Sequence, residues 1–259
     1  MNIRKTKSTL AILSLTALML PALNANAAAI TLTNQGFETG DLTGWNSLGS
    51  VNATPSTSVT TYNSITYNIL AADTNMGYLV SSGASEAQIE TFLGIGAGTL
   101  NALNTNPNGG NLTNGSAISQ IFSGNIGDTI SMYYNYVATD YTPFNDPSFA
   151  VIVAPDNSAF INVLASTHGL GIPVGTAGNS GWNLFQYTLT QVGNYTIGFV
   201  TTNDKDTILN SHLFLDNKAG SCEPACQTQT VPEPASLALF GIGIAGLAAV
   251  RRRKIGMCV

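Results

Sequence analysis

The segment spanning residues 133–149 combines aromatic side chains with short polar ones, the pairing of groups that binds sugars. Its sequence, YYNYVATDYTPFNDPSF, sets Asp140, Tyr141, Asn145 and Asp146 in a loop between two strand-like runs. Aromatic rings stack on the apolar faces of sugars, while amide and carboxylate oxygens accept hydrogen bonds from sugar hydroxyls. We therefore predict that these four residues form a carbohydrate-binding site. In the alternative interpretation, the tyrosines pack in the core and the loop carries ordinary turn residues.

Signatures of the common catalytic sites are missing from the sequence. The two histidines, His168 and His212, lie in no metalloprotease motif, and there is no nucleophile elbow, phosphate-binding loop or dinucleotide fingerprint. Carboxylate pairs that hydrolyse glycosides are defined by their separation in space, which a sequence does not give. The sequence thus favours a non-catalytic protein and leaves open a polysaccharide-acting hydrolase or lyase that uses Glu38, Asp140 or Asp146.

Short apolar or alternating runs between turn residues predict an all-β domain that positions these side chains. Turn sequences such as NIGD at 125–128 and PDN at 155–157 separate the runs. No period of 20–50 residues repeats, which excludes solenoids and propellers. The pattern predicts a two-sheet β-sandwich of the jelly-roll type. Its strands are expected at 30–34, 58–69, 77–81, 117–122, 129–137, 149–154, 160–165, 184–190, 195–201 and 208–216.

One segment departs from this pattern, at residues 85–103 (SEAQIETFLGIGAGTLNAL). Ser85 suits an N-cap, and the apolar residues Ile89, Phe92 and Leu93 recur at helical spacing. We predict a short helix over residues 86–93, a glycine-rich break and a second helical turn at 99–103. The sandwich therefore carries a short helical insertion, which a long polar loop follows.

Two further motifs resemble a known family of sugar-binding domains. The run NQGFETGDLTGW, residues 34–45, resembles the opening of carbohydrate-binding-module jelly rolls and related galactose-binding-like domains, with Phe37 and Trp45 flanking a glycine-rich turn. Residues 213–217 (LFLDN) resemble the closing strand of the same domains. The resemblance implies a jelly-roll fold whose first and last strands lie together.

The same resemblance implies a structural calcium ion. In that family, carboxylates of the first and last strands commonly hold calcium, so Glu38 and Asp216 are the expected ligands and Asp41 is a third candidate. Calcium takes six to eight oxygen ligands, including backbone carbonyls, so these residues alone do not complete the site. In the alternative interpretation, Glu38 is a capping or solvated carboxylate.

Residues 1–27 predict a signal peptide. A basic start is followed by an apolar run at 10–20 and by the small residues ANA at 25–27. Signal peptidase is expected to cleave after Ala27. The folded domain then spans residues 28–220.

The C-terminal segment predicts a sorting tag. The triplet Pro232, Glu233, Pro234 precedes an apolar stretch at 235–250 and four cations at 251–254. This order resembles the C-terminal signal of PEP-CTERM proteins, which Gram-negative bacteria export and pass to an exosortase. The resemblance implies a transmembrane helix at 235–250 that anchors the chain transiently in the inner membrane, with the basic residues on the cytoplasmic side. The processed protein would then reach the cell surface or extracellular matrix.

Charge limits the partners of the exported region. Of nine Lys and Arg, only Lys205 and Lys218 lie between the two targeting segments, against thirteen Asp and Glu from Glu38 to Glu223, so the formal charge there is −11. Such a surface excludes nucleic acid binding by phosphate neutralisation and adhesion to anionic lipid. We therefore expect the protein to contact the membrane only through the C-terminal helix. The acidic surface suits solubility and divalent cations.

Cys222 and Cys226 lie four residues apart in the linker expected at residues 221–231. In an exported chain, a close pair of this kind predicts a disulfide more readily than a metal site, and two reduced thiols are the alternative. So short a loop would act as a local clip, because disulfide stabilisation grows with loop length.

These observations together predict an exported, non-catalytic protein of the cell surface that binds exopolysaccharide or structures a biofilm matrix. A secreted polysaccharide-acting hydrolase or lyase is the alternative. A purely structural matrix component without a ligand site is not distinguished from the first interpretation by sequence.

Overall fold

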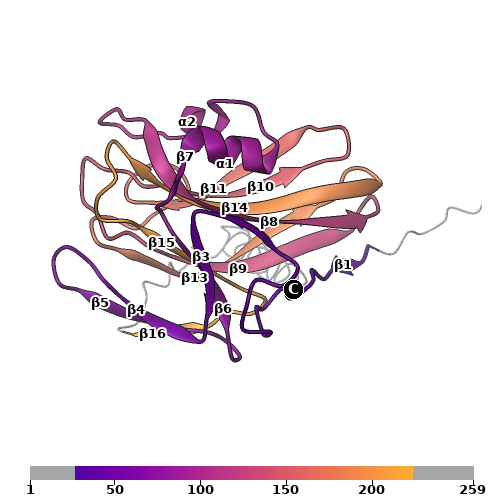
Figure 1. Cartoon of the computed structure of the whole chain (residues 1–259), viewed down its shortest axis with the longest axis horizontal. Coiled ribbons are helices and arrows are strands. Elements are labelled where there is room, and N and C mark those ends of the chain that lie inside the picture. Colours follow the sequence, from indigo (N-terminus) through magenta and orange to yellow (C-terminus); the bar gives the residue numbers. More distant parts are fainter. Residues whose placement is uncertain (1–26, 224–259) are drawn as a thin grey trace, which may run out of the picture.

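The computed structural model describes residues 27–223, and within them two large sheets face each other between a helical layer and a small third sheet (Figure 1). Sheet A has the order β1 (Ala29–Ile30), β9 (Thr129–Val137), β15 (His212–Asp216), β6 (Met76–Val80), β3 (Ser50–Thr54), and β13 (Asn179–Thr188) also pairs with β9. Sheet B has the order β12 (Ile172–Pro173), β11 (Ala159–Ser166), β10 (Ser148–Val153), β14 (Gly193–Asp204), β8 (Leu112–Gly124), β2 (Asn46–Leu48), and β7 (Ala84–Ser85) also pairs with β8. Sheet C consists of β16 (Ser221–Glu223), β5 (Thr66–Leu70) and β4 (Ser56–Thr60).

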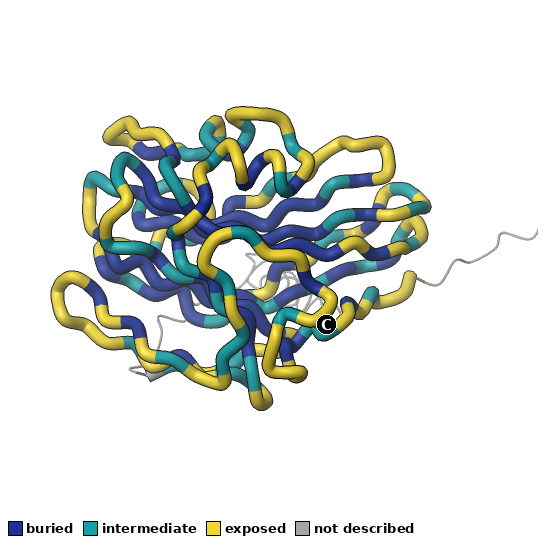
Figure 2. Tube along the Cα trace, in the orientation of Figure 1, coloured by how far each residue is buried: buried dark blue, intermediate teal, exposed yellow. Residues whose placement is uncertain are grey.

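The main core lies between sheets A and B. Side chains alternate across a strand, so every second residue of the long central strands points into the space between the sheets. The inward residues include Ile130, Met132 and Tyr134 of β9 and Tyr195, Ile197 and Phe199 of β14. Figure 2 shows these central strands as buried and the connecting loops as mostly exposed. The predicted two-sheet β-sandwich is confirmed.

Helices α1 (Glu86–Leu93) and α2 (Thr99–Ala102) cover part of the outer face of sheet B. Ser85 caps α1 in a capping box with Gln88, and Gly94 ends it in the left-handed conformation. The buried carboxylate of Glu90 accepts hydrogen bonds from the backbone N–H groups of Gly98 (2.7 Å) and Leu100 (2.8 Å), which ties α2 to α1. The predicted helical insertion is confirmed.

Sheet C covers part of the outer face of sheet A. Val59 of β4 and Ile69 of β5 pack against Val137 and Phe214, which point outward from sheet A. The single strand predicted at 58–69 is therefore wrong: a tight turn closed by the hydrogen bond from Thr61 N–H to the Ile65 carbonyl divides it into a hairpin. The apolar residues on both sides of the turn had hidden its position.

Strands β2 and β3 are not predicted from the sequence, because the mostly polar residues 46–54 show no clear alternation. Residues 221–223, expected in the linker, pair with β5 as β16. Within residues 27–223, neither helix has the length and hydrophobicity needed to cross a membrane. The transmembrane helix predicted at 235–250 lies outside the described residues.

Candidate functional site

Loops at one end of the sandwich bring three of the predicted sugar-binding residues together with Asp204. Asp140 follows β9, Asn145 and Asp146 precede β10, and Asp204 ends β14. β9 of sheet A and β14 of sheet B end, and β10 of sheet B begins, at the same end of the sandwich, so these distant segments become neighbours. Asp140, Asn145 and Asp146 are each 1% exposed, so they contact protein atoms rather than solvent.

Both carboxylate oxygens of Asp146 accept hydrogen bonds. It accepts hydrogen bonds from the Asp204 backbone N–H (2.8 Å) and from the Ser211 hydroxyl (3.0 Å). The Tyr136 hydroxyl donates to its backbone carbonyl. Burial raises the pKa of Asp146 well above its usual range, and the nearby charge of Asp140 adds to this effect. Asp146 thus joins the loop before β10 to the end of β14 and to the residue before β15.

Asn145 connects the neighbouring loops. Its side-chain amide donates to Asn104 Oδ1 (3.0 Å), and its Oδ1 accepts from the His168 backbone N–H (3.1 Å). Its own backbone N–H donates to the Asp204 carboxylate (3.2 Å), which also accepts from the side-chain amides of Asn104 and Asn106. The sequence does not mark Asp204 as a site residue, because the polar run TNDKDT at 202–207 is typical of a hairpin turn.

Asp140 accepts a hydrogen bond from the Tyr141 backbone N–H (2.7 Å). Burial raises the pKa of Asp140 to about 6, and the negative charges of Asp206 and Asp204 act in the same direction. Direct contact of Asp140, Asn145 and Asp146 with a sugar stays a prediction. Their burial favours the alternative that they hold the loops in place.

Tyr141, the fourth predicted sugar-binding residue, lies at the surface. Its side chain is 39% exposed and meets Tyr62, which is 46% exposed, with ring centroids 4.8 Å apart. Phe144 packs edge-on against Tyr141 at 5.5 Å, and the Tyr62 backbone N–H donates to the Thr139 carbonyl (3.3 Å). We call the rings of Tyr62 and Tyr141 the tyrosine platform. Sequence reasoning missed Tyr62 because it lies 79 residues before Tyr141.

The first and last segments meet, as the resemblance implies. The Cα of Gly36 lies against the Asn217 side chain, since a Cβ there would approach it to 3.0 Å. The Glu38 carboxylate accepts from the backbone N–H groups of Thr74 (3.1 Å) and Asn75 (3.1 Å). Gly77 leaves room for the Phe37 ring, which fixes the opening segment on β6.

Asp216 lies beside Glu38 and is fully buried. Its carboxylate accepts from the Ala72 N–H (3.0 Å) and the Asn217 N–H (2.7 Å). Burial raises the pKa of Asp216, and the charge of Glu38 adds to the effect. Lys218, ion-paired with Asp73 at 2.6 Å, brings a positive charge close to both carboxylates.

The fit to calcium is therefore partial. Two predicted ligands, Glu38 and Asp216, come together, but backbone amides already occupy several of their lone pairs. Within residues 27–223, no three His, Cys, Asp or Glu side chains gather in a way that could hold a metal ion. Asp41 is bound locally instead, by the Thr39 hydroxyl (2.6 Å) and the Thr43 N–H (2.9 Å), which lower its pKa. Calcium binding stays a proposal.

Both histidines have structural contacts. His212 Nδ1 shares a hydrogen bond with the Tyr78 hydroxyl (2.8 Å), and burial lowers the pKa of His212 to about 4, so this imidazole is neutral at physiological pH. His168 Nε2 lies 3.1 Å from Asn106 Oδ1, next to the network around Asp204.

The remaining predicted residues lie at the ends of the described range. Ala27 is exposed at its start. Cys222 packs against the small core under sheet C, but Cys226 lies outside the described residues, so their disulfide stays a prediction. Pro232, Glu233 and Pro234 also lie outside.

Comparison with known proteins identifies the C-terminal segment. Residues 230–254 match the PEP-CTERM protein-sorting motif, so the predicted motif is confirmed. The motif implies export, with a final location in the cell envelope or outside the cell. It covers only the C-terminal segment and does not classify the folded domain. No curated protein matches the chain.

Several solved structures have a similar arrangement of strands. A carbohydrate-binding module, TmCBM61, in complex with beta-1,4-galactotriose, is 13% identical with a TM-score of 0.38, covering 71% of this chain and 93% of the module. The CBM22-1 xylan-binding domain of Paenibacillus barcinonensis Xyn10C is 12% identical with a TM-score of 0.32, covering 76% and 96%. The K1 cleaved adhesin domain of Lys-gingipain from Porphyromonas gingivalis is 14% identical with a TM-score of 0.34, covering 70% and 92%. None of these likenesses identifies a ligand of this chain.

Proposed function

We propose that this chain is an exported, non-catalytic protein that binds polysaccharide of the cell surface or biofilm matrix. The observation that carries the proposal is the tyrosine platform, in which two partly exposed rings lie 4.8 Å apart with their planes tilted by 49°. Exposed aromatic faces are costly to leave in water and suit the apolar faces of sugar rings. The loops that carry the tyrosine platform contain buried polar groups that are hydrogen-bonded to one another. The platform is therefore ordered before a ligand binds.

The sorting motif supports delivery of this surface to the outside of the cell, where exopolysaccharide is available. In this proposal, a signal peptidase cleaves after Ala27, and an exosortase acts at the Pro232–Pro234 triplet. The acidic surface favours uncharged glycans, because an anionic polymer would be repelled.

Affinity electrophoresis of the purified full chain in gels containing galactan, xylan or exopolysaccharide from the source bacterium tests the proposal. We expect Tyr62→Ala and Tyr141→Ala each to weaken binding roughly tenfold, since one stacked ring contributes about 0.5–1.5 kcal/mol beyond its buried area. Tyr141→Phe should retain most of the affinity, because it keeps the ring.

The matched control is Phe160→Ala, which removes another exposed ring (44% exposed) that also lies in an aromatic pair, with Tyr187 at 5.0 Å. This variant should bind as the unaltered chain does. Equal loss in all three alanine variants would contradict a role specific to the platform. Release of reducing sugar from any of these polymers would overturn the non-catalytic proposal and favour the hydrolase or lyase.

A further inference from the structure

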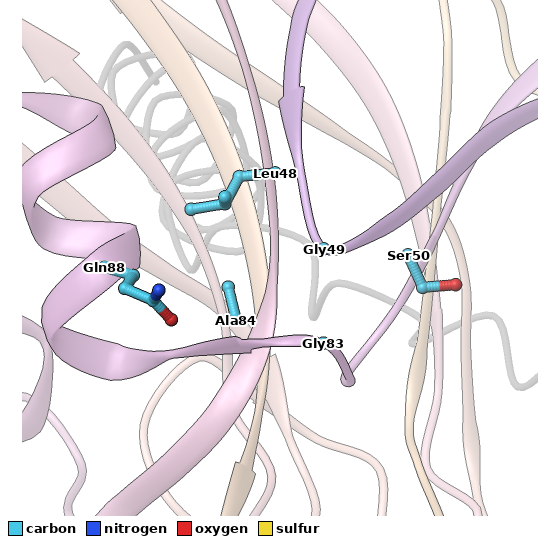
Figure 3. A pocket seen from close by; sticks show the side chains of 6 residues that line it. All are labelled: Leu48, Gly49, Ser50, Gly83, Ala84 and Gln88. Atoms are coloured by element: carbon cyan, nitrogen blue, oxygen red, sulfur yellow. The ribbon is translucent and has the colours of Figure 1, made fainter.

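A groove runs along the outer face of sheet B, between helix α1 and the edge strand β2. Three adjoining cavities of about 360, 410 and 550 Å³ form it. The first two share Leu48 and Gln88, and the last two share Thr91 and Phe92, so the three cavities lie next to one another along α1. Figure 3 shows one end, where Leu48 of β2 and Gln88 of α1 flank Ala84. We call this feature the α1 groove.

The walls of the α1 groove are fixed by close packing. Leu93 of α1 lies directly over Gly198 of β14, where a Cβ would come within 2.4 Å of Leu93 Cδ2. On the other side, Gly49 (φ +82°) follows β2, and a Cβ there would approach the Gly115 carbonyl and Ser116 Oγ to 2.7 Å. Gly49 requires glycine, because its φ is positive and backbone atoms block a side chain, and the small size of Gly198 lets Leu93 pack close to the sheet. The groove is therefore present without a ligand.

No charged side chain lines the α1 groove, although the exported region carries a formal charge of −11. Hydroxyl and amide groups alternate with apolar ones such as Leu48, Phe92 and Ile121, the last of them 66% exposed. A ligand of either charge would find no counter-charge, and an anion would meet the repulsion of the whole domain. The lining complements a molecule with many hydroxyl groups and apolar C–H faces.

Two polar side chains of the α1 groove, Asn46 and Thr196, are available to such a ligand, whereas Ser119 is only 5% exposed. Asn46 of β2 lies opposite Ser119 of β8, and Thr196 of β14 lies on the same outer face. Among the contacts described for residues 27–223, the side chains of Asn46, Ser119 and Thr196 form no hydrogen bond. Polar groups aligned on rigid strands lose little conformational entropy when they bind.

We propose that the α1 groove binds an uncharged, extended polysaccharide chain, at a site separate from the tyrosine platform. The groove lies on the outer face of sheet B, whereas the platform lies between the β4–β5 hairpin and the loop after β9. Its length follows the two turns of α1, about 12 Å at the usual helical rise, and its open form admits the interior of a polymer as well as its end. One molecule then has two places at which to hold the same or neighbouring chains, which raises avidity.

Titration of the purified full chain with soluble uncharged galactan or xylan, followed by calorimetry, tests the proposal. The double variant Asn46→Ala/Thr196→Ala should raise the Kd about tenfold, since it removes two hydrogen-bonding groups. The matched control, Asn52→Ala/Thr188→Ala, removes the same two residue types from exposed positions of sheet A and should bind normally. Thr196→Arg should abolish groove binding, because a long charged side chain would occupy the floor.

The platform variants separate this proposal from the proposed function. In the Tyr62→Ala/Tyr141→Ala double variant, residual binding that Thr196→Arg then removes supports two sites. Unchanged binding in both groove variants, with loss only in the platform variants, overturns the groove. Preferential, salt-sensitive binding of an anionic polysaccharide that the groove variants lose overturns the uncharged ligand. Self-association that disappears in Thr196→Arg assigns the groove to a second copy of the chain instead.

Discussion

Single carboxylates behave very differently in this protein, according to their burial. Asp140 and Asp146 are buried among hydrogen-bond donors, and burial raises the pKa of both. Asp156, by contrast, accepts hydrogen bonds at the surface from Ser158 and Gln191, and these lower its pKa to about 2. The same residue type therefore destabilises the fold as a buried anion and stabilises it at the surface.

Asp140→Asn should reduce the pH dependence of stability. The pKa of Asp140 is about 6 in the folded chain, against 3.8 for an ordinary Asp. Between these values the folded state binds more protons, so the free energy of unfolding falls as pH rises from about 4 to about 6 and stays lower above. We expect Asp140→Asn to be more stable than the unaltered chain at pH 7.5, by about 1–2 kcal/mol, because asparagine keeps the acceptor for Tyr141 N–H.

Thermal melts of both proteins between pH 4.5 and 8 measure this effect. Asp156→Asn is the control: its lowered pKa gives stability that is present above pH 4 and lost only in stronger acid, so its curve should stay parallel to that of the unaltered chain over this range. If the Tm of Asp140→Asn also changes with pH in parallel with that of the unaltered chain, the pKa of Asp140 is not raised in the folded state.

At the scale of elements, loops far apart in the sequence are joined by pairs of side chains. The β4–β5 hairpin reaches the loop after β9 through Tyr62 and Tyr141, and the opening segment reaches the loop before β6 through Glu38. Such contacts depend on strand order, which no local pattern encodes. Helix α1 differs, because its cap, apolar stripe and terminal glycine all lie within ten residues.

Glu38 and Asp216 link the opening segment to the end of β15, so a calcium ion held there would stabilise the fold. If the proposal of calcium is correct, excess chelator should lower the Tm of the purified chain and added calcium should restore it. Glu38→Gln should remove this response, whereas Asp41→Asn should leave it intact, because Asp41 is bound within its own turn. An unchanged Tm in chelator would leave the backbone amides and Lys218 as the partners of both carboxylates.

At the scale of the whole molecule, the chain combines an acidic folded domain with a basic start and a basic end. The sorting motif at residues 230–254 follows the last described strand closely. Both large sheets are partly covered on their outer faces, by α1 and α2 on one side and by sheet C on the other (Figure 1). The α1 groove lies beside the helices that cover sheet B, and the tyrosine platform lies where sheet C meets the loop after β9.

The intact mass of the exported protein should fit a chain that begins at Ala28 and has been processed at its C-terminal motif. A mass lower by two hydrogens before reduction would support the bond between Cys222 and Cys226. Replacement of Glu233 by alanine should leave the C-terminal segment attached, because it alters the motif. A mass that includes residues 1–27 in the exported protein would contradict the proposed signal peptide.

The sequence by itself determined the features that local patterns encode. Alternating runs predicted strands at the positions of β9 and β14, the cap and spacing predicted α1, and the order of proline, apolar and basic residues predicted the sorting motif. Each of these depends on residues that lie close together in the chain. For the same reason, the sequence identified Tyr141 as a candidate but not its partner.

Only the tertiary structure decided which side chains face solvent and which face one another. It buried Asp140, Asn145 and Asp146 inside a polar network, placed Tyr62 beside Tyr141, and opened a groove beside α1 that no motif marks. The physical reason is that burial and contact depend on how strands are ordered across a sheet. That order is selected by packing of the whole core, to which every segment contributes.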